Sequence, residues 1–135
     1  MDNGGLTPLF LVNVVDSSAW LEYFEDGPNA GFFAPAIENQ KNLIVPSICL
    51  YEVFKIILRQ KGKKEALEKT AAMRQAKVAD LNSSLSLQAA SVSLKYKLPM
   101  ADSIVLATAQ LHGAKVWTMD SDFKGLPDVK FIAKK

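Results

Sequence analysis

Short apolar runs that alternate with helical patterns most constrain the fold of this chain. Apolar runs of strand length occupy residues 9–15, 43–45 and 115–119, and two further runs fall at 77–81 and 129–132. Between them, apolar side chains recur at helical spacing. Alternation of this kind is typical of a parallel sheet with helices on both faces. The sequence therefore predicts an α/β fold.

Six helices are predicted between and around these runs. They cover residues 17–24, 32–38, 47–60 and 64–74, a segment with Leu87, Ala90, Leu94 and Leu98 at helical spacing, and residues 101–112. Ser17 or Ser18 is expected to cap the first of them, and Ser47 the third. Gly113 suits the end of the last.

Composition fits one ordinary domain. The chain has 135 residues, of which 49% are hydrophobic, enough for a single core. The one cysteine, Cys49, rules out a disulfide framework and a thiol-based zinc site, which favours a reducing, intracellular setting. No apolar run is long enough to cross a membrane, and we expect a cytoplasmic protein. The domain is expected at 12–135, with 1–11 as an extension that is native, part of the first strand, or an artefact of the start or of cloning.

Acidic residues stand where the predicted strands end. Asp16 closes the first run, and Asp120 and Asp122 follow the run at 115–119. Ligands of open α/β sheets bind outside the carboxyl ends of the strands. If these two strands are neighbours, their carboxylates share one crevice.

Two further acids can reach that crevice. Asp102 falls in the first turn of its helix, where the helix dipole favours an anion. Glu52 lies among apolar residues of its helix, where an uncompensated carboxylate is costly to bury. A salt bridge from Glu52 to Lys55 or Arg59 is the ordinary alternative.

Each of the other acids also has a structural explanation when taken alone. Asp16 fits a helix cap, Asp102 a dipole partner, and Asp120 and Asp122 turn formers. Gathered at one edge, however, the acids would repel one another unless a divalent cation neutralised them. Oxygen ligands without histidine or cysteine suit Mg²⁺ or Mn²⁺. His112 is the only histidine and stands alone at a predicted helix end, so a histidine-dependent catalytic triad is not available. No Gly-x-Gly motif is present to bind a dinucleotide.

Charge is unevenly distributed along the chain. Residues 1–40 hold six acids and no Lys or Arg, whereas residues 55–77 hold eight bases against Glu65 and Glu68. A basic segment of this kind either attracts a polyanion such as RNA or is a solvated helix face.

Four blocks of sequence belong together: VVDSSAW at 14–20, PSICLYE at 46–52, PMADSIVLA at 99–107 and TMDSDF at 118–123. In this order they resemble the PIN domain family, and more narrowly the VapC-type toxin ribonucleases. The resemblance covers nearly all of the chain from residue 12 onward. It implies a sheet of strand order 3-2-1-4-5 between helices.

The resemblance also implies a site and an activity. Asp16, Glu52, Asp102 and Asp120 are the expected catalytic acids, and Asp122 is a supporting acid, with Ser17 and Thr118 as polar neighbours. We expect Asp16, Asp102 and Asp120 to be the main ligands of Mg²⁺ or Mn²⁺, with Asp122 as a further metal-site residue, and Glu52 to orient the attacking water. The substrate is expected to be RNA, with its flanking phosphates held by Lys55, Arg59, Lys63 and Lys64.

Three functions fit this resemblance. The first is the toxin of a toxin–antitoxin pair, inhibited by a small antitoxin and forming a homodimer. The second is a PIN nuclease of RNA processing or decay. The third is a PIN-fold interaction module without activity, against which the presence of all four principal acids argues.

Overall fold

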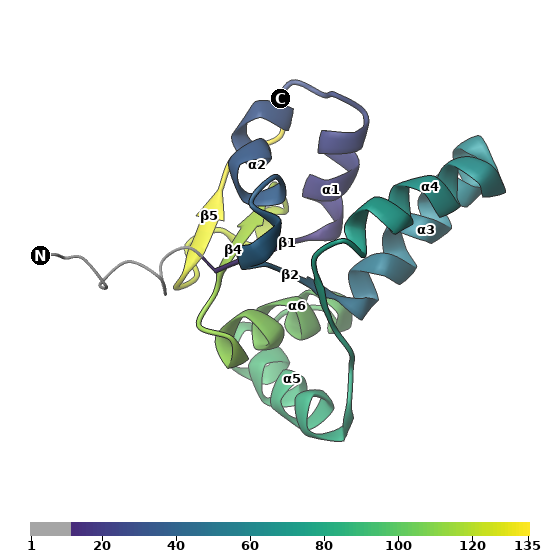
Figure 1. The fold of residues 1–135 in the computed structure, drawn as a ribbon. Helices are drawn as coiled ribbons and strands as arrows, with labels where there is room; N and C mark the ends of the chain where they lie inside the picture. The colour runs from purple at the N-terminus through teal and green to yellow at the C-terminus, as the bar shows by residue number, and fades with distance from the viewer. Residues whose placement is uncertain (1–11) are drawn as a thin grey trace, which may run out of the picture.

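A five-stranded parallel sheet forms the centre of the protein (Figure 1), whose computed structural model describes residues 12–135. The strands are β1 (Asn13–Val15), β2 (Leu43–Pro46), β3 (Lys77–Ala79), β4 (Lys115–Thr118) and β5 (Val129–Phe131). They lie in the order β3-β2-β1-β4-β5, and every neighbouring pair is parallel. The expected fold class and strand order are thus confirmed. Residues 9–11 of the predicted first strand and the proposed extension at 1–11 lie outside the described residues.

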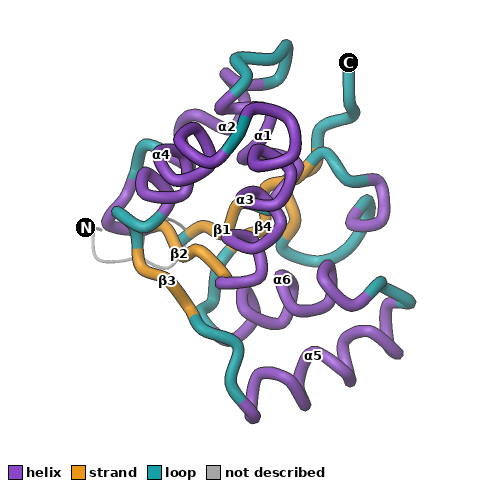
Figure 2. Tube along the Cα trace, turned by 90° about the vertical axis from the view of Figure 1, so that its right-hand side faces the viewer, coloured by secondary structure: helices purple, strands orange, loops and turns teal. Residues whose placement is uncertain are grey.

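Helices cover both faces of the sheet. They are α1 (Ser17–Phe24), α2 (Ala30–Ile37), α3 (Ser47–Lys61), α4 (Lys63–Met73), α5 (Ser83–Tyr96) and α6 (Met100–Leu111), with short 3₁₀ turns η3 (Gln40–Asn42) and η4 (Ser121–Phe123). Figure 2 shows α1, α2 and α4 on one side of the sheet and α6, with α5 outside it, on the other. The α3–α4 hairpin extends beyond the sheet (Figure 1). Among residues 12–135, no helix combines the length and apolar character needed to cross a membrane.

The central strands are buried on both faces, as their continuous apolar sequences require. Val14, Val15, Val45 and Val116 are wholly inaccessible to solvent. Large aromatic side chains fill the layers between sheet and helices, chiefly Trp20, Phe33 and Phe123. This core fixes the strand ends that carry the acidic residues.

Asp16, rather than Ser17 or Ser18, caps α1. Its backbone is extended, and its side chain accepts a hydrogen bond from the amide of Ala19. An N-cap residue needs this extended conformation, and Ser17 and Ser18 are already helical. The serine prediction was therefore wrong by one or two positions.

Ser47 does not cap α3 either. Pro46 holds the N-cap position, and Ser47 is the first helical residue. The Ser47 hydroxyl instead accepts a hydrogen bond of 3.2 Å from the amide of Leu81, which ties the start of α3 to the segment after β3. The predicted break between α3 and α4 is confirmed at Gly62, whose positive φ of 94° suits glycine.

The helical spacing noted at Leu87, Ala90, Leu94 and Leu98 does not mark the buried face of α5. Leu85, Ala89 and Val92 are the buried residues of this helix. Leu87 and Leu94 are 74% and 84% exposed, whereas Leu98, just beyond the helix, is buried. Both sets of residues recur at helical spacing, so periodicity alone could not choose between them.

Candidate functional site

The carboxyl ends of β1 and β4 lie side by side. Val15 pairs with Trp117, and the amide of Asp16 donates a 3.1 Å hydrogen bond to the carbonyl of Trp117. Asp16 is therefore next to Thr118, at the point where both strands end. This pairing confirms that the two acid-bearing turns share one edge of the sheet.

The Asp16 carboxylate is buried and held by three donors. Oδ1 accepts hydrogen bonds from the Ser18 hydroxyl at 2.9 Å and the Ala19 amide at 3.1 Å, and Oδ2 accepts one from the Thr118 hydroxyl at 2.7 Å. Burial raises the pKa of Asp16 to about 6, even though these three hydrogen bonds act to lower it. The Asp120 carboxylate raises this pKa further.

Thr118 connects the two strand-end acids. Its Oγ1 donates to Asp16 and accepts a 2.8 Å hydrogen bond from the amide of Asp120. One wholly buried hydroxyl thus fixes both the Asp16 carboxylate and the backbone that carries Asp120.

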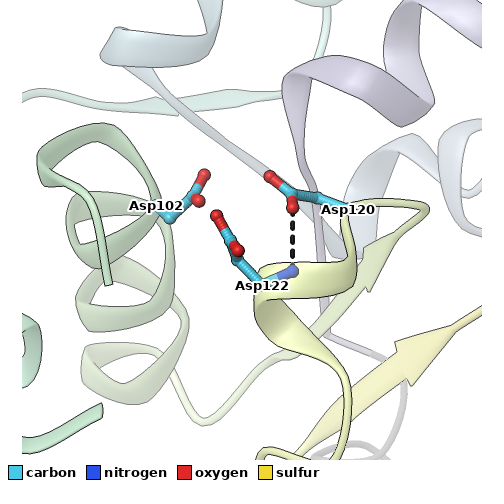
Figure 3. Close-up of side chains that lie close together, drawn as sticks. All are labelled: Asp102, Asp120 and Asp122. Carbon is cyan, nitrogen blue, oxygen red and sulfur yellow. Dashed lines mark hydrogen bonds between the residues drawn. The ribbon is translucent and has the colours of Figure 1, made fainter. Parts of the chain in front are cut away.

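Three carboxylates, those of Asp102, Asp120 and Asp122, face one another in Figure 3. Asp102 comes from the start of α6, and Asp120 and Asp122 from the turn after β4. One carboxylate oxygen from each lies within 4.8 Å of the others. Asp120 Oδ1 also accepts a 2.9 Å hydrogen bond from the amide of Asp122, which orders the turn. We call these three residues the aspartate cluster.

Burial and repulsion from neighbouring acids act together on Asp102. Burial and then the carboxylates of Asp120, Asp16 and Asp122 raise the pKa of Asp102 to about 7. Its place in the first turn of α6, where the helix dipole favours a negative charge, does not remove this repulsion. A group that is easily protonated among other acids is what an unneutralised cation site produces.

Glu52 lies on the other flank of Asp16. The Ser17 hydroxyl donates a 2.6 Å hydrogen bond to Glu52 Oε1, so α1 and α3 are linked directly. Neither Lys55 nor Arg59 forms a salt bridge with Glu52 in the described part of the chain. The polar partner of Glu52 is a serine that directly follows Asp16.

Cys49 is a site neighbour that the sequence reasoning did not assign. Burial raises the pKa of the Cys49 thiol, and the carboxylates of Asp16, Glu52 and Asp102 raise it further. All three acids therefore act electrostatically on one buried position on α3. Spacing in the sequence could have identified Cys49 as a neighbour of the site. It precedes Glu52 by three residues, and residues three apart lie next to each other on a helix.

The predicted basic residues lie at different distances from the acids. Lys55 and Arg59 are on α3, beyond Glu52, whereas Lys63 and Lys64 begin α4. At about 1.5 Å per residue, the end of α3 lies roughly 14 Å along the helix from Glu52. Lys63 and Lys64 are therefore at the tip of the hairpin, and the fold does not bring them to the aspartate cluster.

The donor set of the aspartate cluster fits a hard divalent cation. All three groups supply carboxylate oxygen, no nitrogen or sulfur ligand is among them, and Asp122 is exposed to solvent. Mg²⁺ and Mn²⁺ prefer such oxygen ligands and retain several waters. The cluster can therefore hold an ion that remains open to a substrate.

The protein is thus an α/β domain with a parallel sheet and an acidic site. The carboxylates of this site gather at the carboxyl ends of the central strands. A family model described as "PIN domain" matches residues 14–129. The chain belongs to the PIN domain family. Among curated proteins, no sequence matches it.

Several solved structures with similar folds are toxins or toxin–antitoxin complexes. A toxin–antitoxin complex from Klebsiella pneumoniae aligns with a TM-score of 0.73 and 22% identity, over 87% of this chain and 95% of that one. DNA-bound VapBC from Salmonella typhimurium gives 0.70 and 13%, over 92% and 98%. VapC20 of Mycobacterium tuberculosis, a toxin that cleaves the sarcin–ricin loop, gives 0.69 and 20%, over 87% and 96%. At these identities the similarity establishes the fold.

Proposed function

We propose that this protein is a Mg²⁺- or Mn²⁺-dependent endoribonuclease and the toxin of a toxin–antitoxin pair. The observation that carries the proposal is the meeting of Asp102, Asp120 and Asp122 within 4.8 Å at the carboxyl edge of the sheet. Three carboxylates so close together favour a bound cation, and a cation at an open crevice suits phosphodiester hydrolysis.

The acids and their polar neighbours divide the work of the site in this proposal. Asp102, Asp120 and Asp122 hold the cation, and the buried Asp16 adds negative charge behind them, as a direct ligand or through water. When bound, the cation activates water and stabilises charge on the phosphate oxygens. Glu52, held by Ser17, orients the attacking water. Thr118 keeps Asp16 and Asp120 in register.

RNA is the proposed substrate, preferably single-stranded or looped. Its backbone can enter a carboxylate-lined crevice more easily when it is not paired. The similar structure of VapC20, a toxin that cleaves the sarcin–ricin loop, supports this substrate class. Basic residues of the α3–α4 hairpin, namely Lys55, Arg59, Lys63 and Lys64, would hold flanking phosphates.

A small antitoxin is the proposed protein partner. Support comes from the complexes of Klebsiella pneumoniae and Salmonella typhimurium, which share this fold. A homodimer is a further part of the proposal, and sedimentation velocity of the purified chain would test it.

A cleavage assay tests the proposed activity. Purified protein is incubated with mixed RNA in Mg²⁺, in Mn²⁺ and in EDTA, and the ends of the fragments are mapped. We expect fragments with 5′-phosphate and 3′-hydroxyl ends in the two metal ions and none in EDTA. An Asp102→Asn variant purified in the same way controls for contaminating nucleases. Cleavage that persists in EDTA or in this variant contradicts the proposal, and intact RNA under all conditions favours an inactive PIN-fold module.

A further inference from the structure

Tyr51 is the one exposed aromatic side chain among residues 12–135. It is 59% exposed, whereas the other aromatic side chains of this range are buried or partly buried. Its hydroxyl forms no hydrogen bond with any of these residues. α3 meets the core through another face, with Val53 and Ile57 buried. Packing of the fold therefore does not account for the Tyr51 ring.

Tyr51 lies on α3 between two residues that belong to the surroundings of the acids. Two positions before it is Cys49, the thiol whose pKa the acids of the site raise. Directly after it is Glu52, which accepts the 2.6 Å hydrogen bond from Ser17. Successive residues of a helix point about 100° apart. The Tyr51 ring therefore adjoins the Glu52 carboxylate without being one of the groups at the acidic site.

Lys55 adds a positive charge next to this ring. It follows Tyr51 by four residues and Glu52 by three, so it neighbours both on the surface of the helix. Its Nζ lies 5.6 Å from the centre of the Tyr51 ring. Within residues 12–135 it forms no salt bridge. The Lys55 charge is thus free to hold a phosphate.

A pocket beside the ring has the size and charge for a nucleotide. Its volume is about 800 Å³, within the range of small-ligand sites. Tyr51 and Phe54 are among its apolar walls. Two cations, Lys55 and Arg74, line it against the single acid Asp80. This balance favours an anionic ligand that also has a flat apolar part.

We propose that Tyr51 stacks on an unpaired RNA base close to the scissile phosphate, while Lys55 holds the adjoining phosphate. The inference deepens the proposed function and rests on it. Aromatic rings beside cations bind single strands, because every base offers a flat face and every nucleotide a phosphate. Paired bases are stacked on one another and do not offer that face. Tyr51 therefore selects an unpaired nucleotide rather than a particular base.

A thermodynamic cycle between protein and RNA tests the stacking. The probe is a labelled single-stranded RNA of about eight nucleotides, bound in EDTA and measured by fluorescence polarisation. Matching RNAs each lack one base but keep every phosphate. Tyr51→Ala should weaken binding of the intact RNA at least about fivefold. Loss of one particular base should weaken binding to the wild type by a similar factor, and binding to Tyr51→Ala hardly at all.

Further variants separate stacking from apolar contact and from charge. Tyr51→Trp keeps an aromatic face and should bind as the wild type does. Tyr51→Leu keeps apolar bulk without that face and should bind as Tyr51→Ala does. Lys55→Ala should reduce the slope of log affinity against log salt by about one, whereas Tyr51→Ala should leave this slope unchanged.

Leu111→Ala is the matched control for an exposed apolar side chain. Leu111 is 67% exposed and ends α6, roughly 14 Å along the helix from Asp102. Its replacement should leave RNA affinity unchanged. Circular dichroism confirms that each variant is folded.

Three results would overturn the stacking. The first is equal RNA affinity of wild type and Tyr51→Ala, which would leave the exposed ring to a protein partner. The second is full affinity of Tyr51→Leu. The third is a loss from Tyr51→Ala that adds to the loss from every missing base. A wild type that binds no RNA refutes the stacking as well, and the cleavage assay in Mg²⁺ and Mn²⁺ decides the nuclease activity separately.

Discussion

Thr118 shows how much of the site depends on one side chain that carries no charge. Its hydroxyl donates to Asp16 and accepts from the amide of Asp120, so it sets the relative positions of two acids from different strands. The sequence predicted the acids because carboxylates at strand ends are unusual. It could not predict the bridge, because a threonine before an aspartate is equally compatible with an ordinary turn.

Thr118→Val should separate catalysis from folding. The change keeps the side-chain shape but removes the hydroxyl, so Asp16 loses one donor and the Asp120 amide loses its acceptor. We expect RNA cleavage to fall at least about tenfold and to require more metal ion, with a loss of stability of about 1–3 kcal/mol. Cleavage is measured over a range of Mn²⁺ concentrations.

Thr108→Val is the matched control for this variant. Thr108 is also wholly buried, and its hydroxyl bonds the carbonyl of Ile104 within α6. Its replacement should affect stability but leave the metal requirement of cleavage unchanged. Equal effects of the two variants on cleavage would show that Thr118 acts only through stability.

Asp16→Asn should abolish cleavage without weakening the metal-free fold. Asn retains an oxygen that can accept from Ser18 and Ala19, and it removes a charge whose burial is unfavourable. Thermal unfolding in EDTA should therefore occur at the wild-type temperature or above it. A variant that unfolds well below wild type would identify Asp16 as a purely structural cap.

At the scale of elements, periodicity located the helices better than it identified their buried faces. α5 carries two apolar stripes on opposite sides, one with Leu85 and Val92 and the other with Leu87 and Leu94. Only packing against α6 decides which stripe is buried, and that information lies elsewhere in the chain. Strand neighbours are a similar case, because local sequence does not encode which strands pair.

The start of α4 gives a prediction about RNA binding. Lys63→Ala with Lys64→Ala should weaken RNA binding and flatten its dependence on salt, because fewer counterions are released. Since these lysines lie far from the aspartate cluster, cleavage of a short RNA should change little. Binding is measured by fluorescence polarisation across salt concentrations, and an unchanged slope would place the RNA path elsewhere.

At the scale of the whole molecule, the sequence predicted the architecture and the gathering of acids at one edge. The strand order came from the resemblance of the four sequence blocks to the PIN domain family, and the gathering of acids from their places after strands and within helices. How the acids share protons depends on burial and on distances between side chains, which a linear pattern does not contain. The raised pKa values of Asp16 and Asp102 are therefore results of the structure.

These raised pKa values predict an unusual dependence of stability on pH. The usual pKa of an aspartate is 3.8, and it rises to about 6 for Asp16 and about 7 for Asp102 in the fold. The native state thus binds protons more tightly than the unfolded state, and this contribution to stability is lost as pH rises from about 4 to about 7. For the buried Asp16 the loss is on the order of 3 kcal/mol, and for the half-buried Asp102 it is smaller because solvent screens the charge.

Urea unfolding in EDTA at pH 5 and pH 8 measures this dependence. The wild type should lose more stability between the two pH values than Asp16→Asn does. Saturating Mn²⁺ should reduce the loss, because the cation neutralises the carboxylates at the higher pH. An equal loss in both proteins would remove Asp16 from the explanation.

The claim that the aspartate cluster binds a divalent cation is tested most directly by calorimetric titration of Mn²⁺. The proteins compared are the wild type, Asp102→Asn and Asp26→Asn. Asp26 is an exposed aspartate with φ of 52°, a conformation that asparagine also tolerates, so its variant controls for loss of one negative charge. We predict saturable binding to the wild type and to Asp26→Asn, and at least about tenfold weaker binding to Asp102→Asn. No saturable binding to the wild type, or equal affinity in all three proteins, would contradict the account.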